Sequence, residues 1–410
     1  MKFLHTADWQ IGMRAGHVAA VAERVRAVRL ETVARVMAVA REQGAEFVLI
    51  AGDLFEDNQV ADTLVHQVLR ILGDAAPIPV YVLPGNHDPL GPNSVYNRRA
   101  FQAAPANVLT IRVAEPIVLD RIGTVLLPYP IAQKRSSEDP TAKLPEFDGD
   151  ALVRIGVTHG SLRIEGKYQP DDFPIALDAA ERRGLDYLAL GHWHSFYAHA
   201  GRCVYPGSPE ATGFDEPGSG TVSLVTIADT GSVPSVQQVR AGGLQWTTWD
   251  ETLPDAFEPA FQNLRRRIEA LTVADSQLVR LRIGGRLAAE AHQALDDFAA
   301  WARARLLFLD LDRSGVAADV GRGRLHDLAR AHPLLAGVLA DMAALEILAD
   351  PAAVLEAAGA SNVAGKLDGL QATPAETSTL RQALDLCDGD PRVIHEAVSM
   401  VARLANEVWQ

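Results

Sequence analysis

Short apolar runs alternate with longer amphipathic stretches along the N-terminal part of the chain. Apolar residues dominate 2–7, 47–51 and 80–83, and each run has the length of a buried strand. Between these runs, apolar residues recur at helical spacing over 19–43 and 61–73. This order of strand, helix, strand, helix and strand predicts a sheet that is covered by helices.

Later runs predict more strands but fewer helices. Beyond residue 203 the helical spacing fades, and Gly, Pro and Ser separate the apolar runs. We therefore expect a parallel-to-mixed sheet packed on a second, more antiparallel sheet. The further strands are expected at 125–127, 154–158, 187–190, 204–205, 222–227 and 236–240.

The pattern changes again near residue 250, where a helix–strand–helix–strand order predicts a small two-layer α/β domain. These elements are expected at 257–271, 278–283, 287–305 and 306–311. From about residue 321 the chain is rich in Ala and Leu and predicts helices alone, at 333–349, 351–358 and 376–408. The predicted domains are therefore 1–249, 250–320 and 321–410.

Composition narrows the class of protein. The chain has 410 residues, 48% of them hydrophobic, so it can form large cores without disulfide or metal staples. Its two cysteines, Cys203 and Cys387, exclude a disulfide framework and a thiolate zinc site, which favours a reducing cytoplasm. The N-terminal run is interrupted by His5 and ends at Asp8, unlike a signal peptide. No charge-free apolar run of about 18 residues occurs, so we expect a cytoplasmic protein without a membrane span.

The net negative charge of the chain argues against nucleic-acid binding over its whole surface. The net charge is −14, from 38 basic and 52 acidic residues. Proteins that bind nucleic acid usually carry a basic patch. Bound metal ions can nevertheless make a single site electropositive within an acidic protein.

Five polar clusters follow five of the predicted strands. Ligands of open α/β sheets bind beyond the carboxyl ends of the strands, so one sheet edge can bring all five clusters together. The clusters are Asp8-Trp9-Gln10, Gly52-Asp53, Gly85-Asn86-His87-Asp88, His159-Gly160 and Gly191-His192-Trp193-His194.

Most of these clusters would mean little if they stood alone. A Gly-Asp pair after a strand is usually a turn, and a single histidine is more often a hydrogen-bonded loop residue than a ligand. Their joint order makes coincidence improbable. Aspartate, asparagine and histidine without thiolate suit Mn²⁺ or Fe²⁺, with Zn²⁺ as a further option. There are too many candidate ligands for one ion and about enough for two.

The order of these clusters resembles that of the calcineurin-like metallophosphoesterases. Two longer strings, His5-Thr6-Ala7-Asp8-Trp9-Gln10-Ile11-Gly12 and Ala51-Gly52-Asp53-Leu54-Phe55, are similar to the SbcD family of DNA repair nucleases. The resemblance covers about residues 1–245. It implies an α/β fold, namely a four-layer α/β/β/α sandwich, followed by a small α/β capping domain and a C-terminal helical extension.

The resemblance also implies two divalent metal ions, with Mn²⁺ favoured and Fe²⁺, Mg²⁺ or Zn²⁺ as alternatives. Two such ions can stabilise both the attacking and the leaving oxygen of an in-line displacement. Asp53 would bridge the two ions. One ion would be completed by Asp8, Gln10 and His194, and the other by Asn86, His159 and His192.

Further residues would act on the substrate. The resemblance implies that His87 contacts the scissile phosphate and assists the leaving oxygen, and that Asp88 orients His87. Arg98 and Arg99 follow the same loop and would add phosphate contacts, although a solvated surface is the simpler interpretation of either one.

Two positions depart from the family pattern. Residue 10 is Gln where the pattern has a metal-binding His, and Glu56 stands where many family members have another His. Gln10 can ligate one ion weakly, hold a water, or leave that position partly empty. Glu56 can compensate for residue 10 or repel a phosphate, and the sequence does not decide between these effects.

The implied function is a two-metal DNA nuclease subunit, an exonuclease, an endonuclease or both, acting at or near DNA ends in repair or recombination. Its implied partners are DNA and an SbcC-type SMC-like ATPase that docks on the C-terminal helices. An apolar stripe over 334–345 fits such docking or a core of its own. The resemblance also admits a homodimer. Two alternatives stay open: a metallophosphoesterase for small molecules or phosphoproteins, and a catalytically weak scaffold.

Overall fold

The computed structural model describes residues 1–318 except 150–151, 255–256 and 288. Two compact units are present. The first comprises Met1–Thr248 with Val273–Val279 and Leu306–Phe308, and the second comprises Trp249–Thr272, Arg280–Arg305 and the described residues from Leu309. The predicted C-terminal helices and the whole of 321–410 lie outside the described residues.

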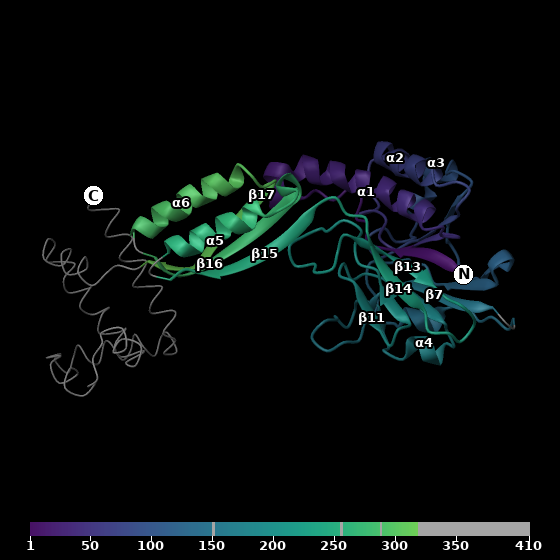
Figure 1. Ribbon diagram of the computed structural model, residues 1–410. Coiled ribbons are helices and arrows are strands. Elements are labelled where there is room, and N and C mark those ends of the chain that lie inside the picture. Colours follow the sequence, from purple (N-terminus) through teal and green to yellow (C-terminus); the bar gives the residue numbers. More distant parts are fainter. Residues whose placement is uncertain (150–151, 255–256, 288, 319–410) are drawn as a thin grey trace, which may run out of the picture. The chain divides into compact units, whose positions relative to one another are not determined.

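Two six-stranded sheets form most of the first unit (Figure 1). The first sheet has the order β14 (Ser235–Arg240), β13 (Thr221–Thr226), β1 (Lys2–Thr6), β2 (Val48–Ala51), β3 (Val80–Leu83) and β4 (Val108–Thr110). The second has the order β11 (Tyr197–His199), β12 (Cys203–Tyr205), β10 (Tyr187–Gly191), β7 (Val153–His159), β6 (Thr124–Pro128) and β5 (Ile117–Leu119). A separate pair consists of β8 (Ser161–Leu162) and β9 (Pro174–Ile175).

The centre of each sheet is parallel and its antiparallel pairs lie toward the edges. β1 to β4 run parallel, and so do β6, β7, β10 and β12. The expectation that the second sheet is the more antiparallel one is therefore wrong. Parallel neighbours need a long return connection, and the segments between Pro128 and Val153 and between His159 and Tyr187 supply it. Those segments contain little helix, so their periodicity did not indicate a parallel pair.

Alternating side chains of the central strands fill two different cores. Phe3 faces the second sheet, where its ring lies 5.6 Å from that of Tyr187. The next residue, Leu4, points the other way and packs in a cluster with Val33 and Met37 of α1 (Ala22–Glu42). The same cluster includes residues of α2 (Asp62–Gly73) and α3 (Arg99–Gln102), while α4 (Ala179–Arg182) packs against the second sheet. The result is a mixed α/β fold of packed sheets and covering helices.

A three-stranded sheet and two helices follow. The elements are β15 (Gln245–Thr252), α5 (Glu258–Glu269), β16 (Gln277–Leu287), α6 (Ala289–Arg303) and β17 (Phe308–Ala318). The helices lie side by side on the sheet (Figure 1), and the rings of Phe261 and Phe298 stack between them at 5.6 Å. The last four elements occupy the predicted positions, whereas β15 runs across the predicted boundary at residue 249.

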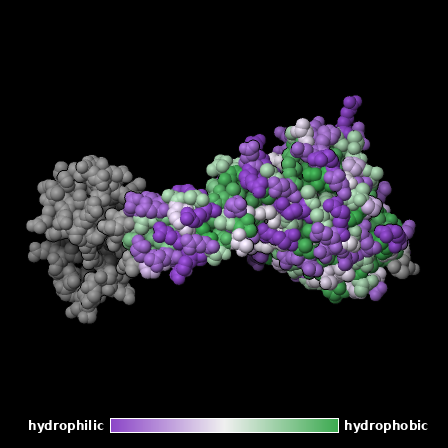
Figure 2. All heavy atoms as spheres, turned by 45° about the horizontal axis from the view of Figure 1, so that its top comes forward, coloured by the Kyte–Doolittle hydropathy of each residue, from purple (hydrophilic) through white to green (hydrophobic). Residues whose placement is uncertain are grey.

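The face of the molecule drawn in Figure 2 is mixed in polarity. Hydrophilic residues are spread over the visible face in Figure 2, with smaller apolar areas between them. Among the described residues, no helix has both the length and the apolar character needed to cross a bilayer.

Buried His5 makes stability depend on pH. Its Nδ1 lies 2.8 Å from the Tyr187 hydroxyl, and burial lowers its pKa from 6.5 to about 3. The folded protein keeps this ring neutral, whereas the unfolded chain takes up a proton as the pH falls below 6.5, so stability is lost between pH 6.5 and about 3. We expect His5→Gln to reduce the loss of unfolding free energy between about pH 6.5 and 5 by about 2 kcal/mol.

Urea unfolding at several pH values measures this effect. His66→Gln is the matched control, because His66 is exposed on α2. The same pH dependence in wild type and His5→Gln would show that His5 is not the source.

Candidate metal centre

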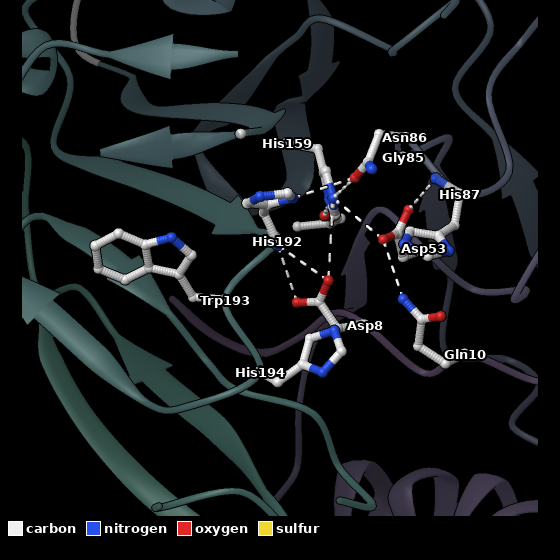
Figure 3. A network of polar contacts seen from close by, with 12 residues as sticks. Asp8, Gln10, Asp53, Gly85, Asn86, His87, His159, His192, Trp193 and His194 are labelled. Carbon is white, nitrogen blue, oxygen red and sulfur yellow. Dashed lines mark hydrogen bonds and ion pairs between the residues drawn. The ribbon is translucent and has the colours of Figure 1, made fainter. Parts of the chain in front are cut away.

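The polar clusters lie at the carboxyl ends of parallel strands from both sheets. Asp8 follows β1, Asp53 follows β2 and Asn86 follows β3, all in the first sheet. His159 ends β7, and His192 follows β10 in the second sheet. Because the two sheets pack together, these side chains meet at one place (Figure 3).

The backbone turns sharply where it delivers these side chains. Asp8, Gln10, Asp53 and His192 all have positive φ, between 49° and 115°, a region that residues with a Cβ rarely occupy. Such strain costs about 1–3 kcal/mol per residue and gathers at functional sites. Its presence at four of the predicted ligands is a second, independent indication that this edge of the sheets is a functional site.

Two glycines allow the backbone to lie close to the predicted ligands. A Cβ on Gly85 would lie 2.1 Å from Oδ1 of Asp53, and one on Gly52 would lie 2.1 Å from Nδ1 of His159. Side chains at either position would push the predicted ligands apart. The glycines in these motifs therefore permit the packing of the site itself.

Two buried carboxylates form the base of the site. Asp8 accepts the backbone N–H of His192 at 3.0 Å on each oxygen, and Asp53 accepts that of His87 at 2.9 Å. One ligand atom each from Asp8, Asp53 and His159 lie within 4.8 Å of one another. These three residues form the candidate metal site.

His159 points an electron pair at this centre. Its Nδ1 lies 2.9 Å from the carbonyl oxygen of Ala51, which can only accept, so Nδ1 carries the hydrogen. In the neutral ring, Nε2 is then an acceptor, and it lies 2.8 Å from Oδ1 of Asn86 and 3.3 Å from Oδ2 of Asp53. Acceptors that converge in this way need either a proton on the ring or a cation between them. Nitrogen and oxygen ligands of this kind suit a divalent metal.

The electrostatics of the cluster show the same need for positive charge. Burial opposes the protonation of His159, but Asp53 outweighs it and raises the pKa of His159 to about 9. Burial likewise opposes the protonation of His194, but Glu216 and Asp8 raise its pKa to about 9. Burial tends to raise the pKa of Asp53, yet His159 and His87 hold that pKa below its usual range. Protons on histidine or bound metal ions can supply this charge.

The remaining predicted ligands surround this core. Nδ1 of His192 lies 3.2 Å from Oδ1 of Asn86. The His194 ring lies beside the Asp8 carboxylate (Figure 3), with its Nδ1 2.7 Å from Glu216 and 3.1 Å from Thr212.

Gln10 is buried and donates its side-chain amide to Oδ2 of Asp53 at 3.2 Å. All seven predicted ligands thus gather at one site.

His87 is held differently from the prediction. Its Nδ1 lies 3.0 Å from the backbone carbonyl of Glu56. Asp88 instead accepts from the Phe55 and Gly85 N–H groups at 2.9 and 2.8 Å, and from the Tyr96 hydroxyl at 2.6 Å. The expectation that Asp88 orients the ring is corrected accordingly: Asp88 fixes two loops, and the Glu56 carbonyl orients His87.

Asp88 is fully buried, and burial together with the charge of Asp53 raises its pKa to about 6. The Glu56 side chain is half-buried, and burial raises its pKa even though His87 and Arg29 oppose the shift.

The two arginines expected to contact phosphate stand apart from the cluster. Arg98 pairs with Asp62 at 2.8 Å and donates to the carbonyl oxygens of Val60 and Asn58. Arg99 is exposed at the start of α3. Within the described part of the chain, no hydrogen bond or ion pair joins either one to the predicted ligands.

Sequence reasoning missed two carboxylates beside the histidines. Asp172 lies 2.6 Å from Nε2 of His192, and Glu216 lies 2.7 Å from Nδ1 of His194. Neither belongs to one of the motifs, and each is far along the chain from its histidine. Only their positions in the folded chain identify them.

Comparison with known proteins agrees with this geometry. Residues 1–196 match the family model of the calcineurin-like phosphoesterases. This part of the chain is therefore similar to the calcineurin-like phosphoesterases, a class of metal-dependent hydrolases.

Individual relatives are distant. The chain is 27% identical over 264 residues to the uncharacterized metallophosphoesterase YhaO of Bacillus subtilis (strain 168). That match spans 60% of this chain and 62% of the relative. Among solved structures, TT1561 of Thermus thermophilus is 12% identical with a TM-score of 0.37, over 58% of this chain and 98% of that one. YfcE, a phosphoesterase from E. coli, is 15% identical with a TM-score of 0.27, over 59% of this chain and 100% of that one.

We expect Gln10 to limit the metal affinity of this site. A neutral amide is a weaker donor than imidazole, and this amide is already bonded to Asp53. We expect Gln10→His to bind Mn²⁺ about 10-fold more tightly, the scale on which changes around a metal site alter its affinity. Calorimetric titration of metal-stripped protein measures this. Gln59→His adds a histidine at an exposed position as the control, and superimposable titrations of wild type and Gln10→His would refute the expectation.

Proposed function

We propose that this protein is a metal-dependent phosphodiesterase that cleaves DNA at or near its ends. The observation that carries the proposal is the convergence of Asp8, Asp53, Asn86 and His159, whose acceptor atoms face one another at the sheet edge. A site of this kind holds divalent cations, and cations there are available to a phosphodiester. We infer two ions, with Mn²⁺ as the favoured metal.

Each part of the site has a task in this proposal. When bound, the ions supply Lewis-acid stabilisation of the negative charge that develops on the phosphoryl group. The Nδ1–H of His87 donates to the Glu56 carbonyl, which leaves Nε2 to face the substrate. A protonated Nε2 can donate to the leaving oxygen, the role of a general acid. The loop bearing His87 is held by the bonds of Asp88 to Phe55 and Gly85.

DNA as the substrate class is supported by the resemblance of the N-terminal strings to the SbcD nucleases. The small unit of α5, α6 and their sheet follows the phosphoesterase domain where those nucleases carry a capping domain. We propose that it serves here as a capping domain in the same sense. The finer fold assignment, a four-layer sandwich, belongs to the same proposal.

A small-molecule or phosphoprotein phosphoesterase is the second candidate. Glu56, one of the two departures from the nuclease pattern, favours a smaller substrate, whereas Gln10 weakens a predicted metal ligand and favours the catalytically weak scaffold. When it is ionised, the half-buried Glu56 carboxylate, on the residue whose backbone contacts His87, opposes the approach of a polyanion. The family match supports both candidates equally.

A nuclease assay on end-labelled single- and double-stranded DNA tests the proposal. Metal-stripped protein receives Mn²⁺, Mg²⁺ or EDTA, and bis(p-nitrophenyl) phosphate is assayed in parallel. We expect Mn²⁺-dependent cutting that EDTA abolishes and that His87→Ala lowers at least about 100-fold through the loss of acid catalysis. His66→Ala, at an exposed helical position, is the control.

The results separate the candidates. Hydrolysis of bis(p-nitrophenyl) phosphate without cutting of DNA would favour the small-substrate enzyme. Hydrolysis of neither compound by Mn²⁺-loaded protein would favour a scaffold of the same fold.

We further propose an SbcC-type SMC-like ATPase as partner, docked on the segment 321–410, and a cytoplasmic location. The support is the resemblance alone. Full-length protein co-expressed with such an ATPase from the same genome is expected to elute with it as one complex in gel filtration. Deletion of 321–410 should abolish co-elution, and separate elution of the full chain would contradict the proposal.

A further inference from the structure

Each histidine at the metal centre has one ring nitrogen bonded to an acceptor outside the predicted ligand set. For His159 this acceptor is the neutral carbonyl of Ala51. For His192 and His194 it is a carboxylate, that of Asp172 at 2.6 Å and that of Glu216 at 2.7 Å. These two carboxylates have no role in the site as the motifs describe it.

We propose that Asp172 and Glu216 are positioning residues that fix which nitrogen of His192 and His194 faces the metal centre. The inference rests on the proposed metal dependence. An ionised carboxylate can only accept, so the ring nitrogen bonded to it must carry the hydrogen. The other nitrogen of the neutral ring then presents its electron pair. For His192 that nitrogen is Nδ1, which lies 3.2 Å from Oδ1 of Asn86, another acceptor.

The Glu216 carboxylate and the backbone of Asp172 are themselves held in place. Thr212 donates its backbone N–H to Oε2 of Glu216 at 2.7 Å, and its hydroxyl bonds Oε1. Asp172 lies two residues before β9, and its backbone carbonyl accepts the N–H of Ser161 at 3.2 Å. Ser161 follows closely after His159, so Asp172 is tied to the strand end that carries another predicted ligand.

The distribution of these carboxylates matches the predicted ion positions. Glu216 supports the position that also contains Gln10, whose amide is a weak donor. A carboxylate behind an imidazole raises the basicity of the ring as a ligand, which is how supporting residues tune a metal site. Glu216 thereby offsets part of the weak donor strength of Gln10. Asp172 has the corresponding role for the ion held by Asn86, His159 and His192.

A purely structural ion pair would give the opposite result. If the carboxylates only stabilised protonated histidines, they would compete with the metal, and removing them would tighten metal binding. If the carboxylates position the rings, removing them weakens metal binding, typically by about 10–100-fold. The sign of the change in Mn²⁺ affinity therefore distinguishes the two roles without any activity measurement.

The experiment is a calorimetric titration of Mn²⁺ into metal-stripped full-length protein. Glu216→Ala and Asp172→Ala are each expected to weaken binding of one ion by about 10–100-fold. Glu216→Gln and Asp172→Asn keep an oxygen acceptor and should weaken it less. Asp171→Asn is the matched control, because the neighbouring Asp171 pairs with the exposed Arg135 at 2.8 Å.

Circular dichroism and thermal melting in EDTA establish that each variant is folded. Where an alanine variant does not fold, the near-isosteric Glu216→Gln or Asp172→Asn variant is titrated in its place. Unchanged or tighter Mn²⁺ binding in the folded variants would overturn the proposal. Because the titration needs no substrate, wild-type protein that binds Mn²⁺ but cleaves no phosphodiester would refute the proposed function alone.

Discussion

The rest of the site depends on two carboxylates that are buried side by side. Asp8 and Asp53 lie at the ends of adjacent parallel strands, and the cationic groups that face them are histidines. Burial of charge without an opposite charge is costly. The histidines around these carboxylates are arranged so that protons or a bound cation can place positive charge at this point. A bound metal ion is the simplest chemical explanation for this arrangement.

The fold secures this arrangement from outside the cluster. Arg29 of α1 is buried and donates to the carbonyl oxygens of Trp9, Glu210 and Ala211, at 2.8, 3.0 and 2.7 Å. It thereby joins the loop after β1 to the segment before β13. On the opposite side, Asp88 joins the loops after β2 and β3. Strained loops at the ends of strands persist because such bonds over-determine their conformation.

The site combines family features with features of its own. The order of its polar clusters is that of the calcineurin-like phosphoesterases, and residues 1–196 match that family. Gln10 and the two carboxylates behind His192 and His194 give this chain a different balance of donors. In the proposed metal site, a weak donor at residue 10 would be combined with histidines that carboxylates support, so that metal affinity would depend on more residues than the motifs contain.

The sequence by itself determined the central strands, the helices α1, α2, α5 and α6, and the polar clusters that follow the strand ends. These follow from local periodicity and from the rule that strand ends of parallel sheets collect ligands. The expectation that one sheet edge collects all five clusters was wrong, because they come from two packed sheets. The parallel order of the second sheet, the true partners of Asp88, and the contacts of Asp172 and Glu216 were decided only by tertiary structure. Asp172 and His192 are 20 residues apart, and His194 and Glu216 are 22 apart. No local pattern encodes such contacts, because they exist only once loops from separate strands have been packed against one another.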